Sequence, residues 1–433
     1  MKEMGSEMSV KFKKLCFAAW LVAGDKKIIH LGGRPLGSRL LAALLAALLL
    51  SFAPASAFAL GFAQVKPAII KTLGHEVPEK YLTKVEGELT NQDALRLAFE
   101  SMGWGFAIKA IDQTALLPEW PDSEGIQMLA SGVRPAAPQS LRAALTAPLT
   151  EEGLAQLTVW LTECKKEISF RTKFDWQGME LILIKRGIGN PEGSANGDLK
   201  AGKNEPLFAA LLAVDMKQIP CQIATAVMVG AHKAPLATIA AENYGVAGGI
   251  NGGYFGGSKP IGVLRRQGYN DNVNYWPNRS AFGWNSDGES RFIDGKTTAS
   301  ISGSHELDRY TEMLQAGPLL IKNGAPSANT EKVYPNVLNS RHPRTFVGSD
   351  GKRVYWGVVD GRDKMHSVGM TIEELRRFCQ QLKLTDALNL DGGGSSSLWW
   401  RGMTFTLPSN SNDAERPIPY AVLMFEPGSG VRN

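Results

Sequence analysis

The chain has 433 residues, 44% of them hydrophobic, which is enough length and apolar content for two globular domains. It contains 47 Lys and Arg against 42 Asp and Glu, a formal net charge of +5, but residues 1–59 hold eight of the basic and three of the acidic residues. The rest of the chain therefore carries 39 charges of each sign. A general polyanion binder keeps a basic excess, so we expect no nucleic-acid partner.

Residues 1–59 have the features of a secretory leader. Arg34 and Arg39 precede an apolar stretch at 40–50, and small residues at 55–59 are typical of a cleavage site. The apolar stretch is short for a membrane-spanning helix. The sequence therefore predicts an exported protein, located in the periplasm, at the cell surface or outside the cell. An uncleaved N-terminal membrane anchor is the alternative.

Residues 60–186 are predicted to form a mainly helical accessory region. Thr90 and Thr150 each precede a run of good helix formers and follow a leucine, which suggests an internal repeat. The pair faintly resembles S-layer homology modules, which bind cell-wall polymers, although a threonine cap at a helix start explains it equally simply. Residues 167–170 and 179–185 have strand-like sequences that could join a later sheet.

Residues 187–205 are rich in Gly, Asn and Pro and are predicted to be a linker. Residues 206–433 then alternate short apolar runs with turn signals, as in a β-rich domain of the α+β class. Asp-Gly turns predict two hairpins, at 279–293 and 344–359. If this division is right, a chain starting near Asn204 should fold and act on its own.

A β-α-β unit is predicted between residues 353 and 390. A strand at 353–359 is followed by a helix that starts at Thr371, with Glu374 completing a capping box, and then by a strand at 387–390. In such a unit the two strands are parallel. Asp360 and Asp391, which directly follow the strands, should therefore emerge at the same edge of the sheet, where ligands bind in open α/β sheets.

The residues after the second strand form a candidate phosphate cradle. Glycines allow successive backbone N–H groups to approach one anion, and serines add hydroxyl donors. The cradle would consist of Gly392, Gly393, Gly394, Ser395 and Ser396. A flexible turn between strands is the alternative.

Six motifs occur in order in the C-terminal half. They are GGINGGYF at 248–255, AGP at 316–318, RHPRT at 341–345, DGR at 360–362, NLDGGGSS at 389–396 and RPIP at 416–419. This set resembles the phosphodiester glycosidase family, which includes the enzyme that uncovers mannose 6-phosphate by removing a covering N-acetylglucosamine. The resemblance implies that residues 206–433 form the catalytic domain of a glycosyl-phosphodiester hydrolase.

Three residues are candidates for proton transfer. Asp391 and Asp360 are expected to supply acid–base help or to activate a water or nucleophile. His342 could donate a proton near neutral pH, or it could be a structural imidazole. His366, in the loop before the capped helix, is expected at the surface.

Arg344 and Arg362 are candidates for bidentate phosphate binding, with a structural ion pair as the alternative for each. The amide of Asn251 could bind a sugar hydroxyl or phosphate, or the residue could occupy a turn. Trp399 and Trp400 could stack on a sugar, but strand alternation would place at least one in the core.

Two functions follow from these candidates. The first is a secreted hydrolase that cleaves the glycosidic bond of a sugar-1-phosphodiester in a phosphorylated glycan or a cell-envelope polymer. The second is a non-catalytic protein that binds cell-wall polymer or polysaccharide on the same scaffold. No cofactor is required by the sequence, although carboxylates beside a phosphate could hold a divalent cation.

Overall fold

The computed structural model shows two compact units, Met1–Leu60 and Gly61–Asn433. The structure describes residues 30–31, 34–35, 60–115, 125–193, 204–217, 223–227, 232–272, 276–301, 307–327, 331, 333, 335–410, 414–426 and 429. In the first unit these residues form two short paired strands, β1 (His30–Leu31) and β2 (Arg34–Pro35). The apolar stretch and cleavage site of the predicted leader lie outside the described residues. Over the described ranges, none of the helices has the length and apolar sequence needed to span a bilayer.

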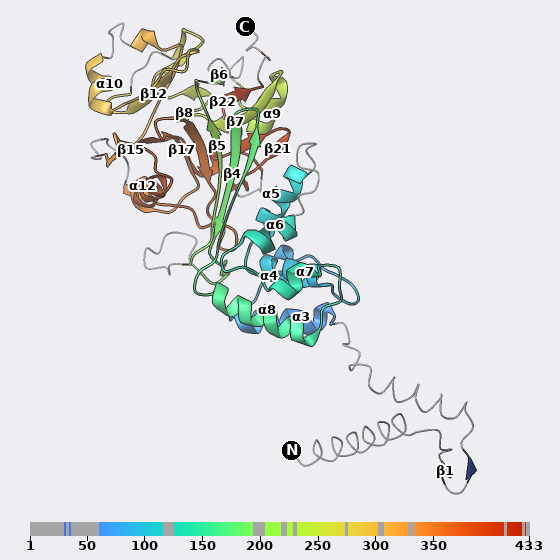
Figure 1. The fold of residues 1–433 in the computed structure, drawn as a ribbon. Coiled ribbons are helices and arrows are strands. Elements are labelled where there is room, and N and C mark those ends of the chain that lie inside the picture. The colour runs from blue at the N-terminus through green and yellow to red at the C-terminus, as the bar shows by residue number, and fades with distance from the viewer. Residues whose placement is uncertain are drawn as a thin grey trace. The chain divides into compact units, whose positions relative to one another are not determined.

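The second unit begins with a group of helices (Figure 1). They are α3 (Phe62–Leu73), α4 (Asn91–Ser101), α5 (Gly105–Ala115), α6 (Gly125–Gly132), α7 (Gln139–Ala143) and α8 (Glu151–Cys164), with a 3₁₀ turn at Glu79–Tyr81. Thr90 caps α4 and Thr150 caps α8, as predicted, because each hydroxyl accepts the backbone N–H three residues ahead. The backbone N–H of Leu149 donates to the carbonyl of Leu89 at 2.8 Å, so the two Leu-Thr pairs lie side by side.

An eight-stranded antiparallel sheet forms the centre of this unit. Its strand order is β16 (Ala325–Pro326), β15 (Leu319–Lys322), β19 (Asp386–Asn389), β17 (Arg344–Ser349), β18 (Val354–Val359), β5 (Leu207–Val214), β4 (Met179–Arg186) and β3 (Ser169–Trp176). β4 pairs with β5 from Met179 opposite Val214 to Arg186 opposite Leu207. The β3–β4 hairpin, which lies in the segment predicted to be an accessory region, is therefore part of the same sheet as the motif-bearing strands.

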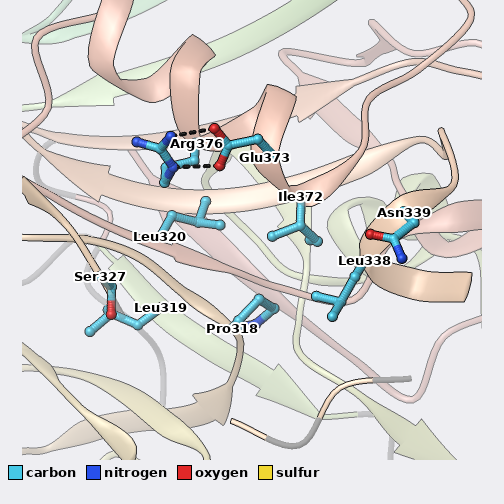
Figure 2. A pocket seen from close by; sticks show the side chains of 9 residues that line it. All are labelled: Pro318, Leu319, Leu320, Ser327, Leu338, Asn339, Ile372, Glu373 and Arg376. Carbon is cyan, nitrogen blue, oxygen red and sulfur yellow. Dashed lines mark hydrogen bonds and ion pairs between the residues drawn. The ribbon is translucent and has the colours of Figure 1, made fainter. Parts of the chain in front are cut away.

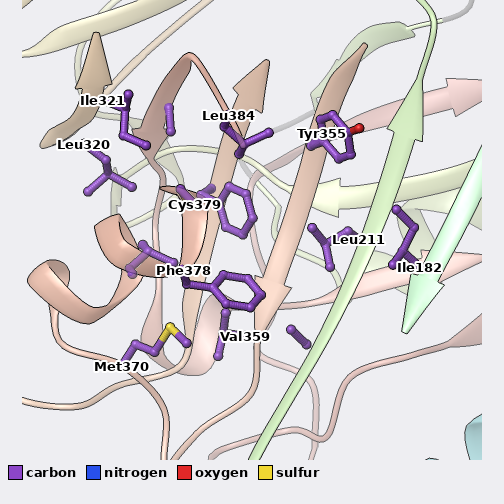
Figure 3. Close-up of a cluster of buried hydrophobic side chains, with 14 of the residues drawn as sticks. Ile182, Leu211, Leu320, Ile321, Tyr355, Val359, Met370, Phe378, Cys379 and Leu384 are labelled. Atoms are coloured by element: carbon purple, nitrogen blue, oxygen red, sulfur yellow. The ribbon is translucent and has the colours of Figure 1, made fainter. Parts of the chain in front are cut away.

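The predicted β-α-β unit is confirmed, with one strand inserted. β18 leads through α12 (Ile372–Gln381) to β19, and both strands pair antiparallel with β17, so they are parallel to each other. Thr371 caps α12 and Glu374 completes the predicted capping box. The apolar face of α12 packs on this sheet through Leu375, Phe378 and Cys379 (Figure 3).

Two further five-stranded sheets complete the α+β fold. One has the order β21 (Met403–Thr404), β20 (Leu398–Trp400), β7 (Val246–Asn251), β22 (Tyr420–Phe425) and β6 (Ile223–Val227), covered by α9 (Leu236–Glu242). The other has the order β11 (Tyr269–Asn272), β10 (Leu264–Arg266), β14 (Glu312–Ala316), β12 (Ser280–Trp284) and β13 (Ser290–Ile293). Short elements lie between these strands: β8 (Phe255–Gly256) paired with β9 (Lys259–Pro260), α10 (Gly295–Ile301), the 3₁₀ turn Leu307–Arg309 and α11 (Pro335–Asn339).

Both predicted hairpins are present, as the β12–β13 and β17–β18 pairs. Trp399 and Trp400, from β20, are both buried, at 8% and 0% exposure. The core alternative that strand alternation suggested is therefore the one that the structure supports.

Candidate active site

One end of the eight-stranded sheet gathers three of the sequence motifs around Pro343. The backbone N–H of Gly393 donates to the carbonyl oxygen of Pro343 at 2.9 Å. A Cβ atom at Gly392 would lie 2.8 Å from that oxygen, and one at Gly361 would lie 2.6 Å from the Pro343 nitrogen. These approaches are too close for any side chain, which explains the glycines in physical terms. The predicted convergence of the Asp360 and Asp391 segments at one sheet edge is therefore observed.

Two arginines lie over residues 392–396, the predicted phosphate cradle, which is the glycine loop of this site. A Cβ atom at Gly393 would be 3.1 Å from Nη2 of Arg362, and one at Gly394 would be 2.7 Å from Nη2 of Arg416. Both side chains are exposed, and neither forms an ion pair with a carboxylate among the residues that the structure describes. Burial lowers the pKa of Arg362, and the neighbouring charge of Arg416 lowers it further. Two exposed guanidinium groups held close together, neither in an ion pair among the described residues, are suited to bind an anion.

Arg416 had no role in the sequence-based site, although it begins the RPIP motif. The sequence pattern alone could not assign Arg416, because this residue comes 20 positions after Ser396, the end of the glycine loop, and reaches the loop only through the fold. Its Nη1 also lies 3.3 Å from Oγ of Ser395, so it contacts the predicted cradle directly.

Asp391 is the carboxylate at the start of the glycine loop, near Arg416. Burial raises the pKa of its carboxyl group to about 6, while the hydroxyl of Ser395 and the charge of Arg416 act in the opposite direction. The negative charge of Asp391 is also felt by Tyr254 and Tyr420, whose phenol pKa values are raised mainly by burial and then by this carboxylate. A carboxyl group that titrates near pH 6 can exchange protons under physiological conditions.

Asp360 occupies a separate environment. Its side chain is 2% exposed, and Oδ2 lies 2.8 Å from Nε2 of His366 and accepts the backbone N–H of Leu407 at 2.9 Å. Burial raises the pKa of Asp360 well above its usual value, and the nearby Lys185 opposes this effect. The described interactions of Asp360 and Asp391 share no residue, so the sheet edge holds two distinct carboxylate environments.

His366 is buried at 3% exposure, so the expectation of a surface histidine is wrong. Its ring packs against Phe106 and Phe208, at centroid distances of 4.8 and 5.0 Å. Burial lowers its pKa well below 6.5, and Nδ1 has no hydrogen-bond partner among the described residues. A neutral ring with its proton on Nε2, donated to Asp360, satisfies this geometry.

Arg344 lies at the site edge but is engaged by the backbone. Its Nε donates to the carbonyl of Met370 at 2.7 Å, and Nη2 donates to those of Val337 and Ser340 at 2.6 and 2.9 Å. The side chain is 3% exposed. These contacts describe a structural arginine that holds the segments on either side of β17.

The side chains of Asn251 and Ser396 form hydrogen bonds inside the protein that fix the position of the glycine loop. The Asn251 amide donates to the carbonyl of Asp391 at 2.8 Å, and its oxygen accepts from Thr345 Oγ1 at 2.8 Å and from the N–H of Ser397. Thr345 Oγ1 also lies 3.2 Å from Oγ of Ser396. Both side chains therefore position the loop by hydrogen bonds within the protein.

His342 contacts the side chain of Arg362. Its Nδ1 lies 3.3 Å from Nη2 of Arg362, which requires Nδ1 to be the acceptor. Burial lowers the pKa of His342, and the charges of Arg344 and Arg362 lower it further. The ring is therefore neutral at neutral pH and orients Arg362.

A cavity of about 210 Å³ lies elsewhere, between β15 and α12 (Figure 2). Leu320 and Ile372 line it, as do Arg376 and its ion-pair partner Glu373. None of the candidate site residues lines this cavity. Across the described ranges, no group of three or more His, Cys, Asp or Glu side chains is arranged to hold a metal ion.

The comparisons with known proteins agree with the motifs. Residues 244–425 match the model of a family described as phosphodiester glycosidase, which confirms the resemblance and its place in the C-terminal half. No protein of curated function matches the chain.

Several solved structures are similar to part of the chain, among them two with 17% and 15% sequence identity. One is the zebrafish N-acetylglucosamine-1-phosphodiester alpha-N-acetylglucosaminidase catalytic domain auto-inhibited by pro-peptide, with 17% identity, a TM-score of 0.46, and coverage of 58% of this chain and 85% of that one. The other is a hypothetical protein from Synechocystis, with 15% identity, a TM-score of 0.44, and coverage of 60% and 77%.

Proposed function

We propose that this protein hydrolyses the glycosidic bond of a sugar-1-phosphodiester. The observation that carries the proposal is the position of Asp391, a carboxyl group with a pKa of about 6. It lies near the charge of Arg416 and directly before the glycine loop that Arg362 and Arg416 contact. The family match at residues 244–425 supports a hydrolase of glycosyl phosphodiesters. A phosphorylated glycan or cell-envelope polymer outside the cytoplasm is the proposed source of substrate, as the leader-like sequence suggests.

The proposed reaction divides the work between the two sides of the site. Arg362 and Arg416 bind the phosphate and stabilise the charge that develops on it as the bond to the sugar breaks. Because the departing phosphomonoester is a stable anion, it needs little protonation. Cleavage therefore depends mainly on a base or nucleophile at the sugar carbon, and ionised Asp391 is that group.

The function is tested by turnover. The chain from Leu60 onward should release a phosphomonoester from at least one member of a panel of sugar-1-phosphodiesters, detected by mass spectrometry. Binding of wall polymer without any turnover, in a protein that is folded, would instead favour the non-catalytic alternative.

The pH dependence follows from the pKa of Asp391. Because the ionised carboxylate is the active form, we expect kcat/KM to rise with pH and to be half-maximal near pH 6. Below that pH it should fall about tenfold per unit. A profile measured from pH 4 to pH 8 checks this expectation, and a rate that increases as the pH falls below 6 contradicts the assigned protonation state.

The two arginine candidates can be separated by the same conservative change. Arg362→Lys replaces a planar fork by a point charge at an exposed site, so we expect KM to rise about tenfold while Tm stays unchanged. Arg344→Lys cannot reproduce the contacts to three carbonyls, so we expect it to lower the free energy of unfolding by about 1–3 kcal/mol with little change in KM. Steady-state kinetics and thermal unfolding of both variants measure the difference, and a reversed pattern would assign the phosphate contact to Arg344.

A further inference from the structure

The loop that carries Arg362 has a strained conformation. It runs from the end of β18 to the start of α12, and Arg362 has a φ of 66°, in the left-handed region that non-glycine residues rarely occupy. Such a conformation persists when the surrounding structure over-determines it, and it is common where a side chain must be aimed at a ligand. The contacts that hold this loop therefore bear on the phosphate site.

The helical region holds one side of the loop. The turn after α4 places Gly103, with a φ of 79°, against the loop, and a Cβ atom there would be 1.9 Å from the carbonyl oxygen of Met365. The hydroxyl of Tyr81 donates to Oδ2 of Asp363 at 3.2 Å, and Asp363 is the residue directly after Arg362. The ring of Phe106, in the first turn of α5, contacts the ring of His366 in the loop that carries Arg362.

The β3–β4 hairpin and the segment after it hold a second side. Nζ of Lys185 donates to the carbonyl of His366 at 2.5 Å, and the side chain is 1% exposed. The N–H of Asn190 donates to the carbonyl of Lys364 at 3.0 Å. Burial lowers the pKa of Lys185 to about 7, and the hydrogen bond to the loop offsets part of the cost of burying this amine.

We propose that the helical region is a positioning element of the anion site, and that Gly103 and Tyr81 hold Arg362 over the glycine loop. The identity of the ligand rests on the proposed function, but the contacts that hold the loop of Arg362 do not depend on it. Gly103 and Tyr81 touch no reacting atom and act through Met365 and Asp363. The region whose sequence faintly resembles wall-binding modules thus has a positioning role next to the site.

A matched pair of glycine variants tests the proposal in the chain from Leu60 onward. Gly103→Ala introduces both backbone strain and a clash with Met365. Gly87→Ala introduces the same strain, at a φ of 82°, with no atom within 4 Å of the new methyl group. We expect Gly103→Ala to raise the Kd for inorganic phosphate at least fivefold, by calorimetry, and Gly87→Ala to leave it unchanged. Tyr81→Phe, which removes only the hydroxyl, should raise the Kd for phosphate about twofold. This variant replaces Gly103→Ala in the test if Gly103→Ala does not fold.

A double-mutant cycle shows whether the effect passes through Arg362. In an Arg362→Ala background, Gly103→Ala should have no further effect on phosphate binding, because the positioned group is already absent. Equal effects in both backgrounds, or an unchanged Kd in the folded single variants, would overturn the proposal.

Amide hydrogen exchange measures, without any ligand, how firmly the loop that carries Arg362 is held. Gly103→Ala should increase exchange at residues 362–369 relative to Gly87→Ala, and unchanged exchange there also overturns the proposal. If exchange responds as expected but the wild-type protein binds no phosphate, the helical region does hold the loop of Arg362, and the proposed function is wrong.

Discussion

Asp391→Asn should reduce kcat about 10²–10⁴-fold while the protein stays folded. The change removes the ionisable group at the start of the glycine loop and preserves its shape and its ability to contact Ser395. It should affect the chemical step rather than phosphate binding, because Arg362 and Arg416 remain in place. Steady-state kinetics on a substrate from the panel measures kcat, and a folded variant with near-wild-type kcat would exclude Asp391 as the catalytic carboxylate.

Stability gives a control for this variant. The pKa of Asp391 is raised from 3.8 to about 6 by folding, so its favourable contribution is complete below pH 3.8 and is lost as the pH rises through 6. Asparagine has no such dependence, so Asp391→Asn should be at least as stable as wild type at pH 7. Asp360→Asn provides the contrast, because it disturbs the contacts with His366 and Leu407 and should lower Tm.

A chain that starts near Asn204 should fail to fold. It lacks β3 and β4 and thereby exposes one edge of β5, a strand that is buried along all of its eight residues. Exposed apolar edge strands favour aggregation, so we expect insoluble protein with no turnover. Expression, solubility and circular dichroism of this chain, compared with the chain from Leu60, measure the effect.

A chain that starts near Thr162 is the matched control. It keeps the β3–β4 hairpin but lacks Tyr81 and Gly103, so it should be more soluble than the shorter chain while binding phosphate weakly. A soluble, cooperatively unfolding chain from Asn204 would instead support the independent C-terminal domain that the sequence predicts.

The sequence predicts the local units of this fold well, because their determinants are local. The Thr371 cap, the two Asp-Gly hairpins and the exit of both aspartates at one sheet edge depend on short-range patterns. The pairing of β4 with β5 does not, since it joins segments separated by the glycine-rich stretch at 187–205. Composition can show a break in the sequence there but cannot show that strands on both sides of it share a sheet.

The composition of the site was harder to predict for the same reason. Arg344 and Arg362 have equivalent chemistry in the sequence, and only the fold shows that one donates to backbone carbonyls and the other lies over Gly393. Lys185 and His366 contact each other across more than 180 residues. No spacing rule connects such positions, so a buried polar network of this kind appears only in three dimensions.

The paired arginines also bear on how the proposed reaction would end. A phosphodiester carries one negative charge, whereas the phosphomonoester produced from it carries close to two at neutral pH. Two guanidinium groups that repel each other match the product better than the substrate. On this reaction, accumulated phosphomonoester would slow the enzyme as its substrate is consumed, and more strongly above pH 6, where the product carries its second charge.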